Sequence, residues 1–207
     1  MRIALSGFAG VGKSTLIDYT AKKYPNVFIS PESAREVAET QDYFQMTDEE
    51  GSVFQKSVMD NELTKINLLL INNIKHALMD RSVIDNLAFA ILFFGKDRVN
   101  YNKVSDHLNQ LCEKYSINHI YDETILIRIS TNKDFINEHV LCDPLRRKTI
   151  TDDAENFIHR GIAWEESFLE IHHKLPMVSK DVRIIEHFTS NSKFMEDFDL
   201  HAKKVWL

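Results

Sequence analysis

The chain reads Gly7-Phe8-Ala9-Gly10-Val11-Gly12-Lys13-Ser14 directly after a short apolar run, residues 3–5. A glycine, any four residues and then Gly-Lys-Ser is the pattern of a phosphate-binding loop between a strand and a helix. Glycines let the backbone adopt conformations that are closed to residues with a Cβ atom, so successive N–H groups can point at one anion. The pattern therefore predicts a loop that binds the phosphates of a nucleotide.

We expect Lys13 to reach the outer phosphates of ATP and the hydroxyl of Ser14 to bind Mg²⁺. The helix that follows adds its positive end to the loop. The alternative is a glycine-rich turn that binds nothing, which the complete match in a strand–turn–helix setting disfavours. The residues predicted to hold ATP are Gly7, Gly10, Val11, Gly12, Lys13, Ser14 and Thr15.

Composition limits the class of protein. The 207 residues are 43% hydrophobic and 27% charged, which is typical of a globular domain, and we expect one domain over residues 1–207. The net charge of -6 disfavours a general nucleic-acid coat, although a local basic site stays open. Cys112 and Cys142 lack the spacing of a metal site, and we expect reduced thiols. No leader or membrane span is recognisable, which favours a cytoplasmic protein.

Apolar runs that are typical of strands alternate with segments of helical periodicity. This order predicts an α/β fold: a doubly wound, mostly parallel sheet of five strands with helices on both faces. Ligands of such sheets bind at the carboxyl ends of the strands. The expected strands are residues 3–5, 27–29, 76–79, 124–129 and 182–185, and the expected helices are residues 15–23, 34–40, 48–74, 84–94, 102–115, 157–171 and 192–206.

Glu32 follows a proline just beyond the second predicted strand. Transfer of a phosphoryl group to an alcohol needs a carboxylate within hydrogen-bond reach of the hydroxyl, to take its proton. We predict this role for Glu32. The alternative is a carboxylate that only stabilises a helix N-terminus.

Asp80 ends the third predicted strand and is the candidate Mg²⁺ ligand. Arg81 beside it is suited to binding the phosphates of donor or acceptor, whereas Ser82 is expected to cap the next helix. A surface ion pair is the alternative for Asp80 and Arg81. Asp122 is a weaker metal candidate, because it precedes its predicted strand and so lies at the opposite edge of the sheet.

Three further groups of residues are candidates for contact with an acceptor or a partner. Arg146 and Arg147 lie in a predicted lid at about residues 142–152 and would close over the transferred group, unless they form a solvated basic turn. Phe54 and Gln55 would stack on and hydrogen-bond a nucleobase, although a helical glutamine is more often exposed. The apolar residues of the helices at 59–74 and 84–94 fit a homodimer interface as well as a core.

The order of these residues resembles the deoxynucleoside kinase family. The shared elements are the phosphate loop, Pro31-Glu32, Phe54-Gln55, Asp80-Arg81-Ser82 and Arg146-Arg147. The resemblance implies a fold of the P-loop NTPase class, nucleoside monophosphate kinase type, with Glu32 as base, Gln55 as reader of the nucleobase and arginines in the lid. Ser33 stands where the family often has a second proline, and Asp80 where it more often has glutamate.

Two other groups are similar as well. Ser33-Ala34-Arg35-Glu36 and Asp80-Arg81-Ser82-Val83-Ile84-Asp85 resemble small P-loop proteins related to ribosylnicotinamide kinase, and thymidylate kinase is similar in layout. The sequence therefore predicts an ATP-dependent kinase of a nucleoside or a nucleoside monophosphate, the latter bound through Arg35. The alternatives are a kinase of ribosylnicotinamide or of a hydroxymethylated base in DNA, and a nucleotide switch or ATPase.

Overall fold

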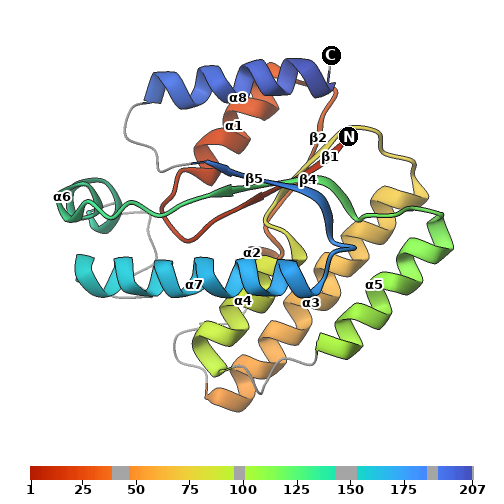
Figure 1. Ribbon diagram of the computed structural model, residues 1–207, viewed down its shortest axis with the longest axis horizontal. Helices are drawn as coiled ribbons and strands as arrows, with labels where there is room; N and C mark the ends of the chain where they lie inside the picture. Colours follow the sequence, from red (N-terminus) through yellow and green to blue (C-terminus); the bar gives the residue numbers. More distant parts are fainter. Residues whose placement is uncertain (39–46, 96–100, 143–152, 186–190, 207) are drawn as a thin grey trace.

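The computed structural model describes residues 1–38, 47–95, 101–142, 153–185 and 191–206, and within them five strands form one parallel sheet (Figure 1). The strand order is β2-β3-β1-β4-β5, and every strand pair is parallel. This confirms the predicted α/β class. The strands are β1 Arg2–Ser6, β2 Phe28–Ser30, β3 Ala77–Asp80, β4 Tyr121–Ile127 and β5 Ser179–Ile185.

Helices cover both faces of the sheet. Figure 1 shows α1 and α8 on one face and α3, α4, α5 and α7 on the other. The helices are α1 Lys13–Lys23, α2 Ser33–Ala38, α3 Asp48–Ile71, α4 Val83–Phe94, α5 Tyr101–Tyr115, α6 Lys133–Phe135, α7 Ala154–Lys174 and α8 Asn191–Trp206, with a π-helical segment η3, Ile136–Leu141, after α6. No helix within the described ranges is both long and apolar enough to cross a lipid bilayer.

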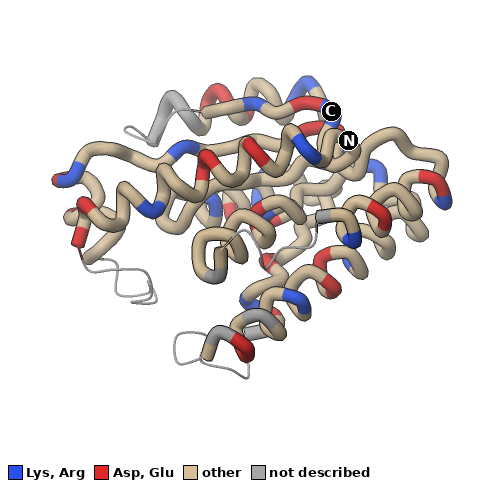
Figure 2. The backbone as a smooth tube through the Cα atoms, turned by 60° about the horizontal axis from the view of Figure 1, so that its bottom comes forward, with Lys and Arg blue, Asp and Glu red and all other residues tan. Residues whose placement is uncertain are grey.

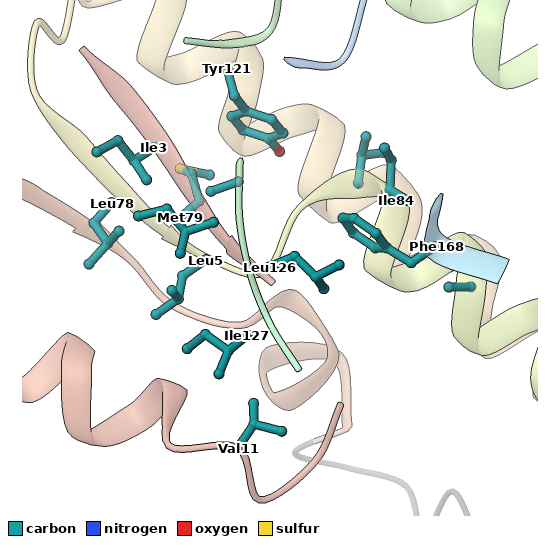
Figure 3. Close-up of a cluster of buried hydrophobic side chains, with 14 of the residues drawn as sticks. Ile3, Leu5, Val11, Leu78, Met79, Ile84, Tyr121, Leu126, Ile127 and Phe168 are labelled. Atoms are coloured by element: carbon teal, nitrogen blue, oxygen red, sulfur yellow. The ribbon is translucent and has the colours of Figure 1, made fainter. Parts of the chain in front are cut away.

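The core lies on both sides of the three central strands, whose residues are almost entirely buried. Such continuous apolar runs are expected where helices cover both faces of a parallel sheet. The buried side chains include Ile3 and Leu5 of β1, Leu78 and Met79 of β3, and Leu126 and Ile127 of β4 (Figure 3). Apolar residues considered above for a homodimer interface, among them Leu63, Ile66, Ile84, Leu87 and Ile91, belong to this core.

Several predicted boundaries differ from the structure. Helix α3 ends at Ile71 rather than at residue 74, because Asn73 adopts a left-handed conformation (φ 51°) and the Ile74 N–H donates to the Leu69 carbonyl. Strand β4 begins at Tyr121, so Asp122 lies inside its strand and not before it. The segments α6 and η3 are short and have no strong periodicity, so the sequence did not predict them.

Candidate functional site

The phosphate loop connects β1 to α1 and packs tightly against the rest of the protein. The φ angles of Gly7 (149°) and Gly10 (74°) are conformations that favour glycine. A Cβ atom on Gly7 would lie 2.7 Å from the carbonyl oxygen of Ile127, and one on Gly10 would lie 2.5 Å from Cγ1 of Val140. The close approach of β4 and η3 therefore requires glycine at both positions.

Aromatic side chains of α4 and α7 pack against Phe8 of the loop. The ring of Phe8 is fully buried, with its centroid 5.8 Å from that of Phe89 in α4 and 5.2 Å from that of Phe157 in α7. Trp164 of α7 contacts both Phe8 and Phe89. Phe8 thus attaches the loop to α4 and α7, which pack against each other.

Lys13 points back into the loop. Its ammonium group donates hydrogen bonds to the carbonyl oxygens of Gly7 (2.6 Å) and Phe8 (2.7 Å). Burial, with a smaller contribution from the positive charge of Arg81, lowers the pKa of Lys13 to about 7. A desolvated cation at this position is strongly attracted to a phosphate group. The neighbouring Ser14 and Thr15 are exposed in the first turn of α1, and Val11 is buried.

Glu32 forms ion pairs with two arginines at the carboxyl ends of β2 and β3. Nε of Arg81 donates to Oε1 of Glu32, and Nε of Arg35 lies 2.8 Å from Oε2. Burial on its own raises the pKa of Glu32, but Arg81, Lys13 and Arg35 outweigh that effect and lower the pKa to about 2. Glu32 is therefore ionised at neutral pH and able to accept a hydrogen bond.

Arg81 is the centre of this arrangement. Its Nη1 donates to the Gly7 carbonyl (3.1 Å) and to Oδ1 of Asp85 (3.3 Å), and its guanidinium lies 4.9 Å from the ring centroid of Phe89. The backbone has φ 83°, which is unusual for a residue with a side chain. Such a conformation persists where surrounding contacts determine it, and it is frequent at functional sites.

Asp85 is a site residue to which the sequence analysis gave no role. It is fully buried and accepts hydrogen bonds from the Ser6 hydroxyl (2.5 Å), the Ser82 hydroxyl (2.7 Å) and the Ser82 N–H (2.8 Å). Ser82 caps α4 as expected. The spacing Ser82-x-x-Asp85 is that of a capping box, and this signal could have identified Asp85 as a partner of Ser82.

Asp80 and Ser14 are the candidate Mg²⁺ ligands. Asp80 is buried at the end of β3, where burial and the negative charge of Glu32 raise its pKa. Nη2 of Arg35 lies 3.5 Å from the Ser14 hydroxyl, and Nε of the same Arg35 pairs with Glu32. The charges of Glu32 and Arg35 also act on Asp80, so both candidates adjoin this ion pair. Mg²⁺ takes oxygen ligands and is often held by only one or two protein groups together with phosphates and water. The hydroxyl and carboxylate present fit such a site, and the cationic loop fits the phosphates of ATP.

Other predicted residues lie elsewhere. The ring of Phe54 is only 5% exposed and packs with Val58 against Ala34 and Val37 of α2, so it offers no open surface for stacking on a base. Gln55 is half-buried beside it. Arg146 and Arg147 fall outside the described residues, as does the rest of the predicted lid from residue 143 to residue 152. Asp122 accepts the Arg2 N–H (2.7 Å) at the amino edge of the sheet, away from the phosphate loop.

Residues 2–170 match the family model described as an AAA domain. This match spans most of the chain and includes the phosphate loop, β3 and most of α7. The chain belongs to this AAA domain family. A search among curated proteins found no match.

Solved structures that are similar to this AAA domain protein include two nucleoside or nucleotide kinases and the protein NadR. Deoxyadenosine kinase from M. mycoides with bound dATP has 16% identity over 99% of both chains and a TM-score of 0.66. NadR in complex with NR has 17% identity over 100% of this chain and 52% of its own, with a TM-score of 0.64. Thymidylate kinase from Candida albicans has 16% identity over 98% and 91% of the chains, with a TM-score of 0.56. At this identity the likeness shows the fold, and it confirms the P-loop kinase resemblance of the sequence at that level.

Proposed function

We propose that this protein is an ATP-dependent kinase that phosphorylates a nucleoside or a nucleoside monophosphate. One observation carries the proposal: the ionised carboxylate of Glu32 lies against Arg81, which itself contacts the first residue of the phosphate loop. A proton acceptor, a cation and a phosphate-binding loop therefore adjoin one another. The similar fold of a deoxyadenosine kinase and a thymidylate kinase supports the same conclusion.

Each residue then has a role in phosphoryl transfer. ATP supplies the phosphoryl group, and Ser14 and Asp80 would hold Mg²⁺, which would offset the negative charge of the phosphates. Lys13 and the loop N–H groups bind the phosphates. Glu32 accepts the proton of the acceptor hydroxyl as its oxygen bonds to phosphorus and ADP leaves, while Arg81 stabilises the negative charge on the transferred group. We assign Arg146 and Arg147 the same stabilising role.

The arginines also control the basicity of Glu32. With both arginines paired to it, a carboxylate of pKa about 2 is a weak base. The side chain of Arg35 is 65% exposed, so it is free to turn from Glu32 toward an incoming phosphate. Loss of one cationic partner raises the pKa of a carboxylate toward its ordinary value. Glu32 thus becomes a better base when phosphate is bound.

The nature of the acceptor follows from the same residues. A nucleoside hydroxyl must lose a proton, which favours a site built around Glu32, whereas a monophosphate is already ionised and chiefly needs cations such as Arg35. Gln55 is our candidate for contact with the base, held in place by the packing of Phe54 against α2. The likeness to NadR keeps ribosylnicotinamide as an alternative acceptor. Charged positions of both signs are interspersed along the helices (Figure 2), which gives DNA containing a hydroxymethylated base less support as the acceptor.

The test is ATP consumption with Mg²⁺ against ribo- and deoxynucleosides, their monophosphates, ribosylnicotinamide and hydroxymethylated DNA. We expect turnover with one acceptor class, reduced about a hundredfold or more by Glu32→Gln. Glu113→Gln, on the exposed side of α5, is the control for the same chemical change and should retain full activity. Slow hydrolysis that is independent of every acceptor and survives Glu32→Gln would show a nucleotide switch or ATPase instead.

A further inference from the structure

Lys65 and Glu62 of α3 hold the turn that carries Glu32, and Lys65 makes the first attachment. The ammonium group of Lys65 donates to the carbonyl oxygen of Pro31 (2.5 Å) and pairs with Glu36 of α2 (2.6 Å). Only 14% of the Lys65 side chain is exposed, so this cation is largely withdrawn from water. Asn61, one helical turn earlier, donates to the same Glu36 carboxylate (2.8 Å).

Glu62 makes the second attachment from a buried position. The hydroxyl of Ser33 donates to Oε2 of Glu62 (2.5 Å), and the hydroxyl of Tyr121 in β4 lies 3.4 Å from Oε1. Glu62 is 1% exposed, and Tyr121 is fully buried in the core (Figure 3). Glu62 thereby connects the turn to the central sheet.

The two attachments flank Glu32 in sequence. Lys65 binds the backbone carbonyl of Pro31, and Glu62 binds the side-chain hydroxyl of Ser33, so the residue on each side of Glu32 is tied to α3. The side chains of Arg81 and Arg35 bind the Glu32 carboxylate, and the backbone N–H of Arg35 donates to the Glu32 carbonyl (3.2 Å) as α2 begins. In the proposed reaction, phosphate is an alternative partner for both arginines. It is not an alternative partner for Lys65 and Glu62 of α3.

We propose that Lys65 and Glu62 are positioning residues that keep Glu32 in place for catalysis when its arginine partners turn to phosphate. This inference rests on the proposed role of Glu32 as base. A displacement of about 1 Å in a reacting group can reduce a rate by about a hundredfold. The apolar contact of Phe54 and Val58 with α2 is separate from these polar contacts and continues to dock the two helices without them.

The test is a double-mutant cycle of Lys65→Met and Glu32→Gln, with turnover, affinity for ATP and urea unfolding measured for each protein. We expect Lys65→Met to lower kcat about ten- to a hundredfold and to leave ATP affinity within about twofold of the wild type. In the Glu32→Gln background the same change should have no further effect on kcat, because Lys65 acts through Glu32. Lys56→Met, at an exposed position of the same helix, is the matched control and should have wild-type turnover.

Glu62 supplies a second, independent comparison. Glu62→Gln keeps an oxygen that accepts from Ser33 and should retain most of kcat, whereas Glu62→Leu removes the acceptor and should lower kcat as Lys65→Met does. If Lys65→Met does not fold, Ser33→Ala replaces it in the cycle.

The outcomes separate the two proposals. A full effect of Lys65→Met in the Glu32→Gln background would show a general structural role and overturn the positioning role. A wild-type kcat for Lys65→Met, in a protein whose turnover depends on Glu32, would also overturn the positioning role. Turnover that is indifferent to Glu32→Gln would overturn the proposed function itself, and with it any positioning of a base.

Discussion

The hydroxyl of Ser6 donates to Oδ2 of Asp85 over 2.5 Å and joins the last residue of β1 to the first turn of α4 across 79 positions of sequence. The same carboxylate accepts from Arg81 and from Ser82. One buried side chain therefore links the start of the phosphate loop to the arginine that pairs with Glu32.

Asp85→Ala should strongly destabilise the fold. The substitution leaves the Ser6 hydroxyl buried without this acceptor and removes one of two carboxylates that pair with the buried guanidinium of Arg81. Loss of one partner from a buried ion pair costs about 3–5 kcal/mol. Urea unfolding measures the loss, with Asp106→Ala at an exposed position of α5 as the control. A loss below about 1 kcal/mol would show that the hydrogen bonds of Asp85 are not important for stability.

Lys13→Ala should strongly weaken ATP binding and keep the fold. Lys13 is a desolvated cation that contacts only loop carbonyls among the hydrogen bonds described for it, so phosphate loses a strong partner when it is removed. We expect affinity to fall by about 2–5 kcal/mol, or at least about thirtyfold. Equilibrium dialysis measures the affinity, and circular dichroism verifies the fold. Lys22→Ala, exposed on α1, should bind normally. Normal ATP binding by Lys13→Ala would contradict the assignment of the loop.

Glu62 should make stability depend on pH. Burial raises the pKa of Glu62 from 4.5 to about 7, although the Ser33 hydrogen bond and the charge of Lys65 lower it. Between these two values the folded protein keeps a proton that the unfolded chain releases. The contribution of Glu62 to the free energy of unfolding therefore falls as pH rises, by up to about 1.4 kcal/mol per pH unit. At low pH, where both states are protonated, this loss is absent.

Glu62→Gln removes that titration and provides the measurement. Relative to the wild type, the variant should gain about 2–3 kcal/mol of stability between about pH 4.5 and about pH 7.5. Urea unfolding of both proteins at the two ends of this range gives the difference. A difference that is the same at both pH values would show that Glu62 has an ordinary pKa in the folded protein.

Gly161→Ala should destabilise the contact between α7 and the phosphate loop. A Cβ atom at this position would lie 2.2 Å from Cδ1 of Ile129 and 3.2 Å from Cδ1 of Phe8. Overpacking of a core typically costs about 1–3 kcal/mol. Thermal unfolding measures the cost, and Glu166→Ala on the exposed side of α7 is the control. Ile129→Val deletes the Cδ1 atom, so the double variant should be more stable than Gly161→Ala alone. If it is not, the clash with Ile129 is not the cause.

The strands and most helices were predictable because their signals are local. The apolar runs of β1 and β3 and the glycine pattern between β1 and α1 each lie within a few consecutive residues. The position of Glu32 near Arg81 followed from one further rule, that the carboxyl ends of parallel strands share an edge of the sheet. The pairing of β1 with β3, in which Leu5 is opposite Asp80, and of β2 with β3 agrees with that rule.

The burial of Phe54 is a feature that local sequence patterns do not predict. An aromatic residue followed by glutamine near the start of a helix fits a base-binding site, but only the docking of α2 decides whether the ring is open or covered. Composition and spacing do not contain that information, because helix–helix contacts depend on side chains that are distant in sequence.

The sequence by itself determined the phosphate loop, the parallel α/β sheet and the edge at which Glu32, Asp80 and Arg81 lie, because these depend on short patterns and on general rules of sheet topology. Only the tertiary structure decided that Arg81 and Arg35 both bind Glu32, that Asp85 joins β1 to α4, and that Lys65 and Glu62 hold the turn around Glu32. Most of these contacts connect residues 29 to 79 positions apart. Folding brings such groups together through core packing, and hydrogen bonds and charge then select their partners.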